Sequence, residues 1–443
     1  MEGQRHGEDD HGEVTIPEAI QMAIGWHREG KVRSAAEVYR RVLAQDPDHV
    51  DALHFLGIAL HQLGRGADGA ELLRRALELM PEYAEASNNL GNVLKEGGDL
   101  VGAEEAYRRA LELQPDNPDT LNNLGVVLKE LGHLNDAVTI FDQALTIDPH
   151  HADLWHNLGN TLKKIGRIDE ALTAYRQAIT LKPYHIEAYR NLGRMLYIAG
   201  RSHEAAEVYR QWLSRDPDNP VARHLFAACS RGNVPTRASD AYVVATFDSF
   251  ATSFDDVMAR LNYQAPVLVL DAINRAVGEP SGTLTVLDAG CGTGICGPLL
   301  RPYASHLTGV DLSQGMLNQA GGRGVYDVLV QAELTSYLSV QKGQFDLIVS
   351  VDTLCYFGEL GPVISVASEA LRPNGLVVFT LEAAADAAFH AYDLQPHGRY
   401  AHGIEYVRKM LTGAGIHYVS VQQGFLRSEG GAQVKGLVVV SRG

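Results

Sequence analysis

The sequence predicts an all-α repeat solenoid followed by a doubly wound α/β domain. Three observations support this prediction. A spacing of 34 residues recurs between residues 16 and 219, a glycine-rich turn follows a short apolar run at 284–289, and further apolar runs alternate with helix-like stretches. The 443 residues suffice for two or three domains, and a hydrophobic content of 45% is enough to form their cores.

Residues that recur at the 34-residue spacing explain why the first half should form helix pairs. A glycine where the first helix ends permits a left-handed turn, and a proline after the second helix prevents its continuation. Since one helix pair cannot bury its apolar face alone, successive pairs are expected to stack. The recurring residues are Pro47, Pro81, Pro115, Pro149, Pro183 and Pro217, with Gly30, Gly64, Gly98, Gly132, Gly166 and Gly200.

This pattern resembles the tetratricopeptide repeat. The resemblance implies six helix–turn–helix units that start at residues 16, 50, 84, 118, 152 and 186. The segment 220–230 is predicted to add a capping helix, so that the repeat domain spans 16–230 and the next domain spans 231–443. The polar segment 1–15 is predicted to form a disordered tail.

The resemblance also implies a concave groove, lined by the first helices, in which a peptide or protein binds. Four units carry an asparagine at one position, as in the repeats of O-GlcNAc transferases, whose asparagine ladder holds an extended peptide: Asn89, Asn123, Asn157 and Asn191. An asparagine side chain both donates and accepts hydrogen bonds, as a peptide group does. Alternatively, these asparagines support hydrogen bonds within the repeats. Residues 1–230 hold 35 acidic and 24 basic side chains, which favours a basic or neutral partner.

Apolar runs of strand length dominate the second half. Helix-like segments separate the first five runs, which indicates right-handed crossovers and a parallel sheet. The last two runs are close together and predict a hairpin at one sheet edge, with 424–431 as its loop. The runs are 284–289, 306–312, 326–330, 345–351, 375–381, 417–422 and 434–441. A ligand is expected at the carboxyl ends of the strands.

The glycine-rich turn after the first run is the candidate ligand site. Its glycines let the backbone approach a ligand closely, and Asp311, at the end of the next run, would accept hydrogen bonds from ribose hydroxyls. The segment 292–297 also fits the G-x-G-x-x-G pattern of dinucleotide sites. However, Asp288 would repel a pyrophosphate and attract a sulfonium or ammonium group, and the terminal hairpin is not typical of dinucleotide sheets. We therefore expect a positively charged nucleoside.

At VLDAGCGTG the domain resembles class I S-adenosylmethionine-dependent methyltransferases, over residues 241–443. The resemblance implies lid helices within 241–278 that bring Phe254 against the cofactor. It assigns the methionine end to Asp288, Gly290, Cys291, Gly292, Thr293 and Gly294, the ribose to Asp311, the adenine to Leu312, Met316, Ala332 and Glu333, and the space below the methyl group to Ser350 and Val351. More narrowly, FDSFATSFDD, LNYQAP, YDVLVQAEL and GRYAH resemble predicted methyltransferases that carry tetratricopeptide repeats.

Four residues near the expected pocket mouth are candidates for contact with the methyl acceptor. A general base is needed for a hydroxyl or ammonium acceptor and unnecessary for a thiolate or carboxylate. Tyr356 and His402 are the candidate bases, and Arg399, beside Tyr400, could pair with a substrate carboxylate. Asp352 is not followed by the Pro-Pro-aromatic signature of exocyclic-amine methylation, which disfavours nucleic-acid bases as the target.

Composition excludes several other classes. Acidic residues outnumber basic ones by 54 to 38, which disfavours nucleic-acid binding. Cys291 and Cys296 lack the further ligands of a metal site, and four scattered cysteines form no disulfide framework. Without a membrane-spanning run or a signal-like start, a cytoplasmic protein is expected. Two functions are left open: a methyltransferase whose repeats recruit a partner, and a repeat scaffold that binds the cofactor without turnover.

Overall fold

The computed structural model describes residues 15–230, 232, 234–384, 391–429 and 432–443. The predicted tail, apart from Thr15, lies outside the described residues. The chain divides into two compact units, 1–188 and 189–443. This boundary falls inside helix α11 (Ile186–Ile198), so most of the sixth repeat and the capping helix belong to the same unit as the α/β domain.

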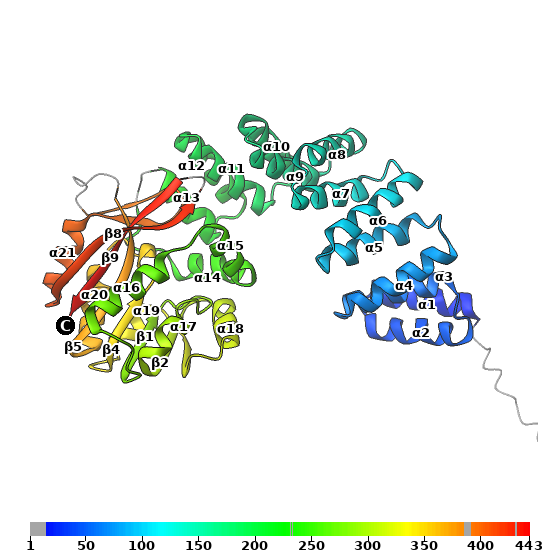
Figure 1. Ribbon diagram of the computed structural model, residues 1–443. Helices are drawn as coiled ribbons and strands as arrows, with labels where there is room; N and C mark the ends of the chain where they lie inside the picture. Colours follow the sequence, from blue (N-terminus) through cyan, green and yellow to red (C-terminus); the bar gives the residue numbers. More distant parts are fainter. Residues whose placement is uncertain (1–14, 231, 233, 385–390, 430–431) are drawn as a thin grey trace, which may run out of the picture. The chain divides into compact units, whose positions relative to one another are not determined.

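The first unit is a series of helix pairs, as predicted (Figure 1). In its five pairs, and in the sixth pair at the start of the second unit, the glycine between the helices has a φ between 75° and 87°, the left-handed conformation that favours glycine. The helices are α1 (Ile16–Arg28), α2 (Val32–Gln45), α3 (Val50–Gln62), α4 (Gly66–Leu79), α5 (Ala84–Glu96), α6 (Leu100–Leu113), α7 (Pro118–Leu131), α8 (Leu134–Ile147), α9 (Ala152–Lys164) and α10 (Ile168–Leu181).

Close contact inside each pair depends on a second glycine, in the first helix. A Cβ atom at Gly91 would lie 2.5 Å from the Tyr107 ring, which is fully buried in the partner helix. The same relation recurs between Gly125 and Phe141, at 2.6 Å. A large ring therefore packs directly on the backbone of the facing helix.

The second unit begins with helices and continues into a sheet. The remaining helices are α12 (Ser202–Arg215), α13 (Pro220–Ser230), α14 (Asp240–Asp248), α15 (Phe254–Arg260), α16 (Ala265–Val277), α17 (Gly297–Leu300), α18 (Gln314–Gly322), α19 (Leu334–Ser339), α20 (Gly361–Ala370) and α21 (Ile404–Gly413). The strands are β1 (Leu284–Ala289), β2 (Ala304–Asp311), β3 (Val328–Gln331), β4 (Phe345–Ser350), β5 (Leu371–Ala383), β6 (Tyr392–Leu394), β7 (Tyr400–His402), β8 (His417–Glu429) and β9 (Ala432–Arg442).

The sheet has the predicted parallel body and terminal hairpin. Strands β3, β2, β1, β4 and β5 pair in that order and run parallel, while β9 pairs antiparallel with β5 and with β8. Two features differ from the prediction. Residues 424–429, expected in the hairpin loop, belong to β8, and the short strands β6 and β7 were not expected.

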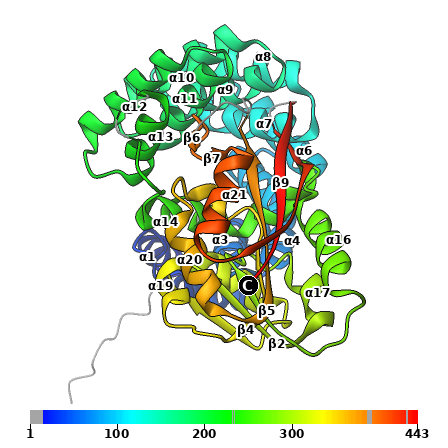
Figure 2. The same ribbon diagram turned by 90° about the vertical axis from the view of Figure 1, so that its left-hand side faces the viewer.

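Helices cover both faces of this sheet (Figure 2). On one face Leu287 and Ile348 pack with α20 and α21, and on the other Val286 and Leu347 pack with α16 and α17. Adjacent strand residues thus alternate between two hydrophobic cores, as a doubly wound sheet requires. None of the helices in the described part of the chain has the length and apolar character needed to cross a membrane.

Candidate functional site

An open cavity of about 120 Å³ lies at the carboxyl ends of β1, β2 and β4. Its wall includes most of the predicted cofactor residues: Asp288, Gly290, Cys291, Gly292, Thr293, Asp311, Leu312, Met316, Ala332, Glu333, Val351 and Phe254. The candidate base Tyr356 also lines it. The expected place of the ligand, at the carboxyl ends of parallel strands, is therefore a real cavity.

The glycine-rich turn shapes one wall of this cavity. Gly290, Gly292 and Gly294 have φ values of 80°, 55° and 79°. A Cβ atom at Gly290 would lie 2.1 Å from the Thr353 hydroxyl, whereas one at Gly292 would meet no atom within 4 Å. Gly292 thus leaves open space for a ligand. Gly294 does not line the cavity and packs instead against the Tyr326 ring.

Asp288 is a buried carboxylate at the base of the turn. Its side chain accepts a hydrogen bond of 2.7 Å from the Tyr326 hydroxyl, and only 1% of the residue is exposed. Burial raises the pKa of Asp288 to about 7, although the Tyr326 hydrogen bond acts in the opposite direction. A cation beside Asp288 would favour its charged form.

Asp311 is held in a fixed orientation at the end of β2. Its two carboxylate oxygens accept hydrogen bonds of 2.9 Å from the backbone N–H groups of Gly292 and Ser313. Burial raises the pKa of Asp311, and these hydrogen bonds partly offset that rise. A fixed carboxylate next to open glycine backbone suits recognition of a pair of hydroxyls.

The two residues assigned to the adenine edge already have partners. The backbone N–H of Ala332 donates to the Asp311 carbonyl at 3.1 Å. Glu333 caps α19 by accepting from Thr335 N and Ser336 N at 3.0 and 2.7 Å. Burial acts to raise the pKa of Glu333, but these hydrogen bonds outweigh it and lower the pKa. Glu333 therefore has a structural role as well as a place in the cavity wall.

The lid helices are fastened to the cavity loops by two aspartates that the sequence reasoning missed. Asp255 on α15 accepts from the Thr293 hydroxyl at 2.5 Å and pairs with Arg323. Asp248 on α14 accepts from the Ser313 hydroxyl at 2.5 Å. Both lie in the FDSFATSFDD segment, which also contains Phe254, the predicted aromatic contact of the lid. These contacts join α14 and α15, the predicted lid helices, to the turns that contain Ser313 and Thr293.

Besides Gly294, four predicted residues do not line the cavity. Ser350 is buried below the wall and donates to the Ala289 carbonyl at 2.9 Å. His402 and Tyr400 belong to β7, with exposures of 1% and 0%. Arg399 is ion-paired and does not line the cavity. The placement of the last three at the pocket mouth is therefore wrong.

The environments of these residues give the physical reasons for the correction. His402 Nε2 lies 3.2 Å from the Gly358 carbonyl, and burial lowers the pKa of His402 to about 4. The Tyr400 hydroxyl donates to the Pro235 carbonyl at 2.8 Å. Arg399 pairs with two carboxylates of its own chain, so it is not available for a substrate carboxylate.

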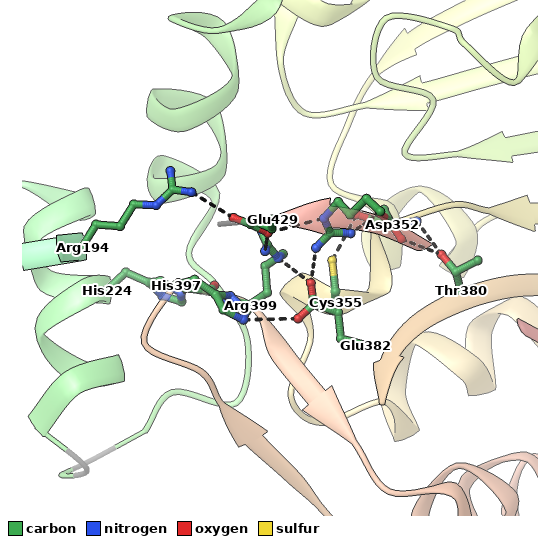
Figure 3. A network of polar contacts seen from close by, with 11 residues as sticks. Arg194, His224, Asp352, Cys355, Thr380, Glu382, His397, Arg399 and Glu429 are labelled. Carbon is green, nitrogen blue, oxygen red and sulfur yellow. Dashed lines mark hydrogen bonds and ion pairs between the residues drawn. The ribbon is translucent and has the colours of Figure 1, made fainter. Parts of the chain in front are cut away.

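Figure 3 shows the ion-pair network that contains Arg399. The sequence pointed to Arg399 but not to this network. Buried Arg427 donates to the cavity-lining Asp352 at 2.6 Å and also pairs with Glu382. Arg399 links Glu382 to Glu429. Burial acts to raise the pKa of Glu429, but Arg399 and Arg427 lower it to about 2. The network was not predicted because Arg427 and Glu429 lie in 424–431, which was expected to be a loop and not part of a strand.

The same network extends to the helices at the start of the second unit. Arg194 on α11 pairs with Glu429 at 3.3 Å. On α13, His224 Nε2 lies 2.8 Å from the Gly398 carbonyl, and its ring stacks on Tyr242 with centroids 3.9 Å apart. These contacts explain why the last repeat and the capping helix form one unit with the α/β domain.

In the first unit the asparagine ladder connects neighbouring repeats. Asn123 donates to Asn92 at 3.2 Å, and Asn157 donates to Asn122 at 2.9 Å. Asn89 Nδ2 lies 2.9 Å from His54 Nε2 in the preceding repeat. These three amides have intramolecular partners, in keeping with the alternative that they support the repeats. Asn191 lies on α11.

None of the described residues forms a group of three or more histidine, cysteine, aspartate or glutamate side chains that could hold a metal ion. The two cysteines of the turn are buried thiols, and burial raises the pKa of both Cys291 and Cys296. They lie in the wall beside Asp288, and repulsion from that carboxylate adds to the rise. A protonated thiol is a poor metal ligand.

Comparison with known proteins agrees with the division into a repeat region and an α/β domain. A family model described as a methyltransferase domain matches residues 287–379, and models of the tetratricopeptide repeat match 28–83, 91–132, 116–183 and 156–220. A solved structure of Pseudomonas aeruginosa pilF is 20% identical with a TM-score of 0.42, and the match covers 48% of this chain and 96% of that one.

Curated relatives match part of the chain. Methyltransferase-like protein 27 of Homo sapiens is 35% identical over 136 residues, which cover 30% of this chain and 55% of the relative. A malonyl-[acyl-carrier protein] O-methyltransferase of Pseudescherichia vulneris is 32% identical over 31% of this chain and 52% of its own length. The chain therefore spans about half the length of these relatives.

Proposed function

Because the chain carries tetratricopeptide repeats followed by a methyltransferase domain, we propose that it is an S-adenosylmethionine-dependent methyltransferase whose repeats hold a peptide or protein partner. The observation that carries the proposal is the pair Asp288 and Asp311, on either side of the open backbone at Gly292. One carboxylate is buried and suits a cation, and the other is fixed for hydroxyls.

The cavity residues fit the proposed cofactor chemically. When bound, S-adenosylmethionine supplies a methyl group on a positively charged sulfur. Asp288 would favour the cationic methionine end, Asp311 would bind the ribose, and Leu312 and Met316 would offer apolar contact to the adenine. The four acidic residues of the wall, with Arg237 already paired to Asp240, make the cavity more suitable for a cation than for a diphosphate.

The protein's contribution to transfer is mainly positioning and exclusion of water. Phe247 and Phe254 from the lid and Tyr356 from the wall enclose the cavity, and the Phe247 and Tyr356 rings meet edge-on with centroids 5.4 Å apart. Alignment of two reactants in such a site lowers a barrier by about 7–11 kcal/mol. Tyr356 is retained as a proposed acceptor contact, and burial raises its pKa.

The test of the site is calorimetric titration of the full chain with S-adenosylmethionine. Asp288→Asn and Asp311→Asn are each expected to weaken binding at least about tenfold, because each removes a charge-assisted contact. Asp327→Asn is the matched control, since Asp327 pairs with Arg301 away from the cavity. Absence of wild-type binding at millimolar cofactor would contradict the proposal.

Recruitment of a partner by the repeats is tested separately. Peptides selected by display on the full chain should be recovered less well by a variant with Asn123→Ala and Asn157→Ala. The net charge of the repeat half predicts that the selected peptides are basic or neutral. Equal recovery by the variant would show that the ladder only supports the repeats. Cofactor binding without any methyl transfer to selected peptides or small molecules would favour the scaffold function.

A further inference from the structure

Asp352 is a carboxylate of the cavity wall that the proposed cofactor leaves without a role. The wall holds Asp288, Asp311, Glu333 and Asp352, and the first three are assigned to the methionine end, the ribose and the adenine. Asp352 follows the carboxyl end of β4, and 18% of its side chain is exposed. It lies in the wall with Thr353 and Tyr356, beyond the glycine-rich turn.

The backbone at Asp352 is held in an uncommon conformation. Its φ is 52°, a left-handed value that costs free energy for a residue other than glycine. Thr380 on β5 stabilises it twice, because its hydroxyl accepts from Asp352 N at 2.7 Å and donates to Asp352 Oδ1 at 2.9 Å. Such an arrangement is typical of a side chain that must point in one direction.

A buried arginine fixes the other carboxylate oxygen. Arg427 donates from Nη1 to Asp352 Oδ2 at 2.6 Å, and only 5% of the Arg427 side chain is exposed. The β8–β9 register shifts between Phe425 and Arg427, a β-bulge that leaves the consecutive residues Leu426 and Arg427 both buried. Bulges of this kind redirect side chains beside functional sites.

The carboxylate of Asp352 retains capacity for another hydrogen-bond donor. A carboxylate has about four lone-pair positions, and Thr380 and Arg427 each occupy one. The neighbouring wall is apolar and aromatic, with Val243, Phe247 and Tyr356. A donor arriving from the cavity would thus meet a fixed acceptor next to a surface suited to a ring or an alkyl group.

The charge of the wall disfavours an anionic acceptor. Against four carboxylates, Arg237 is the cation among the described wall residues, and it already donates to Asp240 at 2.6 Å and to the Ala238 carbonyl at 3.2 Å. A second carboxylate brought beside Asp352 would lose hydration and meet repulsion.

We propose that Asp352 binds the methyl acceptor directly and that the acceptor is a hydroxyl or amine attached to an aromatic or apolar group, not a carboxylate. This inference rests on the proposed methyltransferase function. In the transfer a bond forms from the acceptor oxygen or nitrogen to the methyl carbon. The carbon–sulfur bond breaks and leaves its electron pair on sulfur. The proton of the acceptor passes to Asp352 and then to water. Arg427 and Thr380 are positioning residues.

The experiment measures which small molecules bind to the full chain saturated with S-adenosylhomocysteine, so that no turnover occurs. The probes are phenol, benzylamine and benzoate, titrated by calorimetry at pH 7.5. Phenol or benzylamine should bind at least about tenfold more tightly than benzoate, because a hydrogen bond to a charged group is worth about this factor. Asp352→Asn should reduce the preference to less than about threefold while leaving the S-adenosylhomocysteine Kd within about threefold.

Asp346→Asn is the matched control, since Asp346 lies on β4, the strand that precedes Asp352, and also pairs with an arginine, Arg372, but is not in the wall. Asp346→Asn should leave the preference for phenol or benzylamine over benzoate unchanged. Thr380→Val keeps the charge of Asp352 but removes both hydrogen bonds of the Thr380 hydroxyl, and it should reduce the preference for phenol or benzylamine over benzoate about threefold. This variant serves as the test if Asp352→Asn does not fold.

Three results would overturn the inference. They are benzoate binding as tightly as phenol and benzylamine, a preference that survives in Asp352→Asn, and binding of neither phenol nor benzylamine below 10 mM. Any one of them excludes Asp352 as the acceptor site. If the wild-type chain binds neither S-adenosylmethionine nor S-adenosylhomocysteine, the proposed function fails instead. The two failures are thus distinguished by the first titration.

Discussion

The two sides of the cavity are held by different means. On the β1–β2 side, backbone N–H groups of the adjacent turns hold Asp311. On the β4–β5 side, Asp352 is held by Arg427, which is 75 residues further along the chain. The first side is built from contacts between consecutive strand ends, and the second depends on buried charges brought together by the sheet. The two sides should therefore respond differently to substitution.

The largest effect is expected on the β4–β5 side. Arg427→Met would leave the Asp352 carboxylate without its ion-pair partner and would remove one of the partners of buried Glu382, and we expect a loss of about 3–5 kcal/mol in the free energy of unfolding. Urea denaturation followed by circular dichroism measures it. Arg372→Met removes an exposed ion pair with Asp346 and should cost less than about 1 kcal/mol. Equal losses in the two variants would contradict the comparison.

The same contrast explains which parts of the fold and of the cavity could be predicted from the sequence and which could not. The repeats and the turn at Gly290–Gly294 depend on spacing and on residue types near in sequence, so their fold and the residues of the β1–β2 side could be predicted. Arg427 could not, because a charged residue in a β-bulge interrupts the alternation that indicates a strand. His402 was misplaced for a similar reason: three residues of β7 are too few to show a pattern.

The repeats extend the comparison to a region of purely local packing. Gly91→Ala would place a methyl group 2.5 Å from the Tyr107 ring, and the resulting overpacking should destabilise the repeats by about 1–3 kcal/mol. Gly97→Ala is the matched control, because Gly97 has a φ of −75° and a Cβ there would lie 3.4 Å from its nearest neighbour. Denaturation midpoints of both variants are compared. A tolerated Gly91→Ala would show that the helix pair can separate at little cost.

On the β1–β2 side we expect a pH effect on cofactor binding. With a pKa of about 7, the Asp288 carboxyl is about one-tenth ionised at pH 6 and about nine-tenths ionised at pH 8. Since a cation prefers the ionised form, the Kd for S-adenosylmethionine should fall about tenfold over this range. Without ligand, the free energy of unfolding should instead fall as the pH rises toward 8. A raised pKa means that the folded protein binds the Asp288 proton more tightly than the unfolded chain does, so this group favours folding at low pH. Calorimetry at several pH values measures the Kd, and Asp288→Asn should abolish its slope.

The smallest effect is expected from the asparagine ladder, where single neutral hydrogen bonds connect repeats. Asn157→Ala removes the donor to Asn122 and should lower the free energy of unfolding by about 0.5–1.5 kcal/mol. Gln114→Ala, an exposed position after α6, is a suitable control with no expected change. Because Asn157 belongs to the first unit and the cavity to the second, the Kd for S-adenosylmethionine should stay within about twofold of the wild-type value. A larger change in Kd would mean that the repeats and the cavity are energetically coupled and that the ladder contributes to cofactor binding.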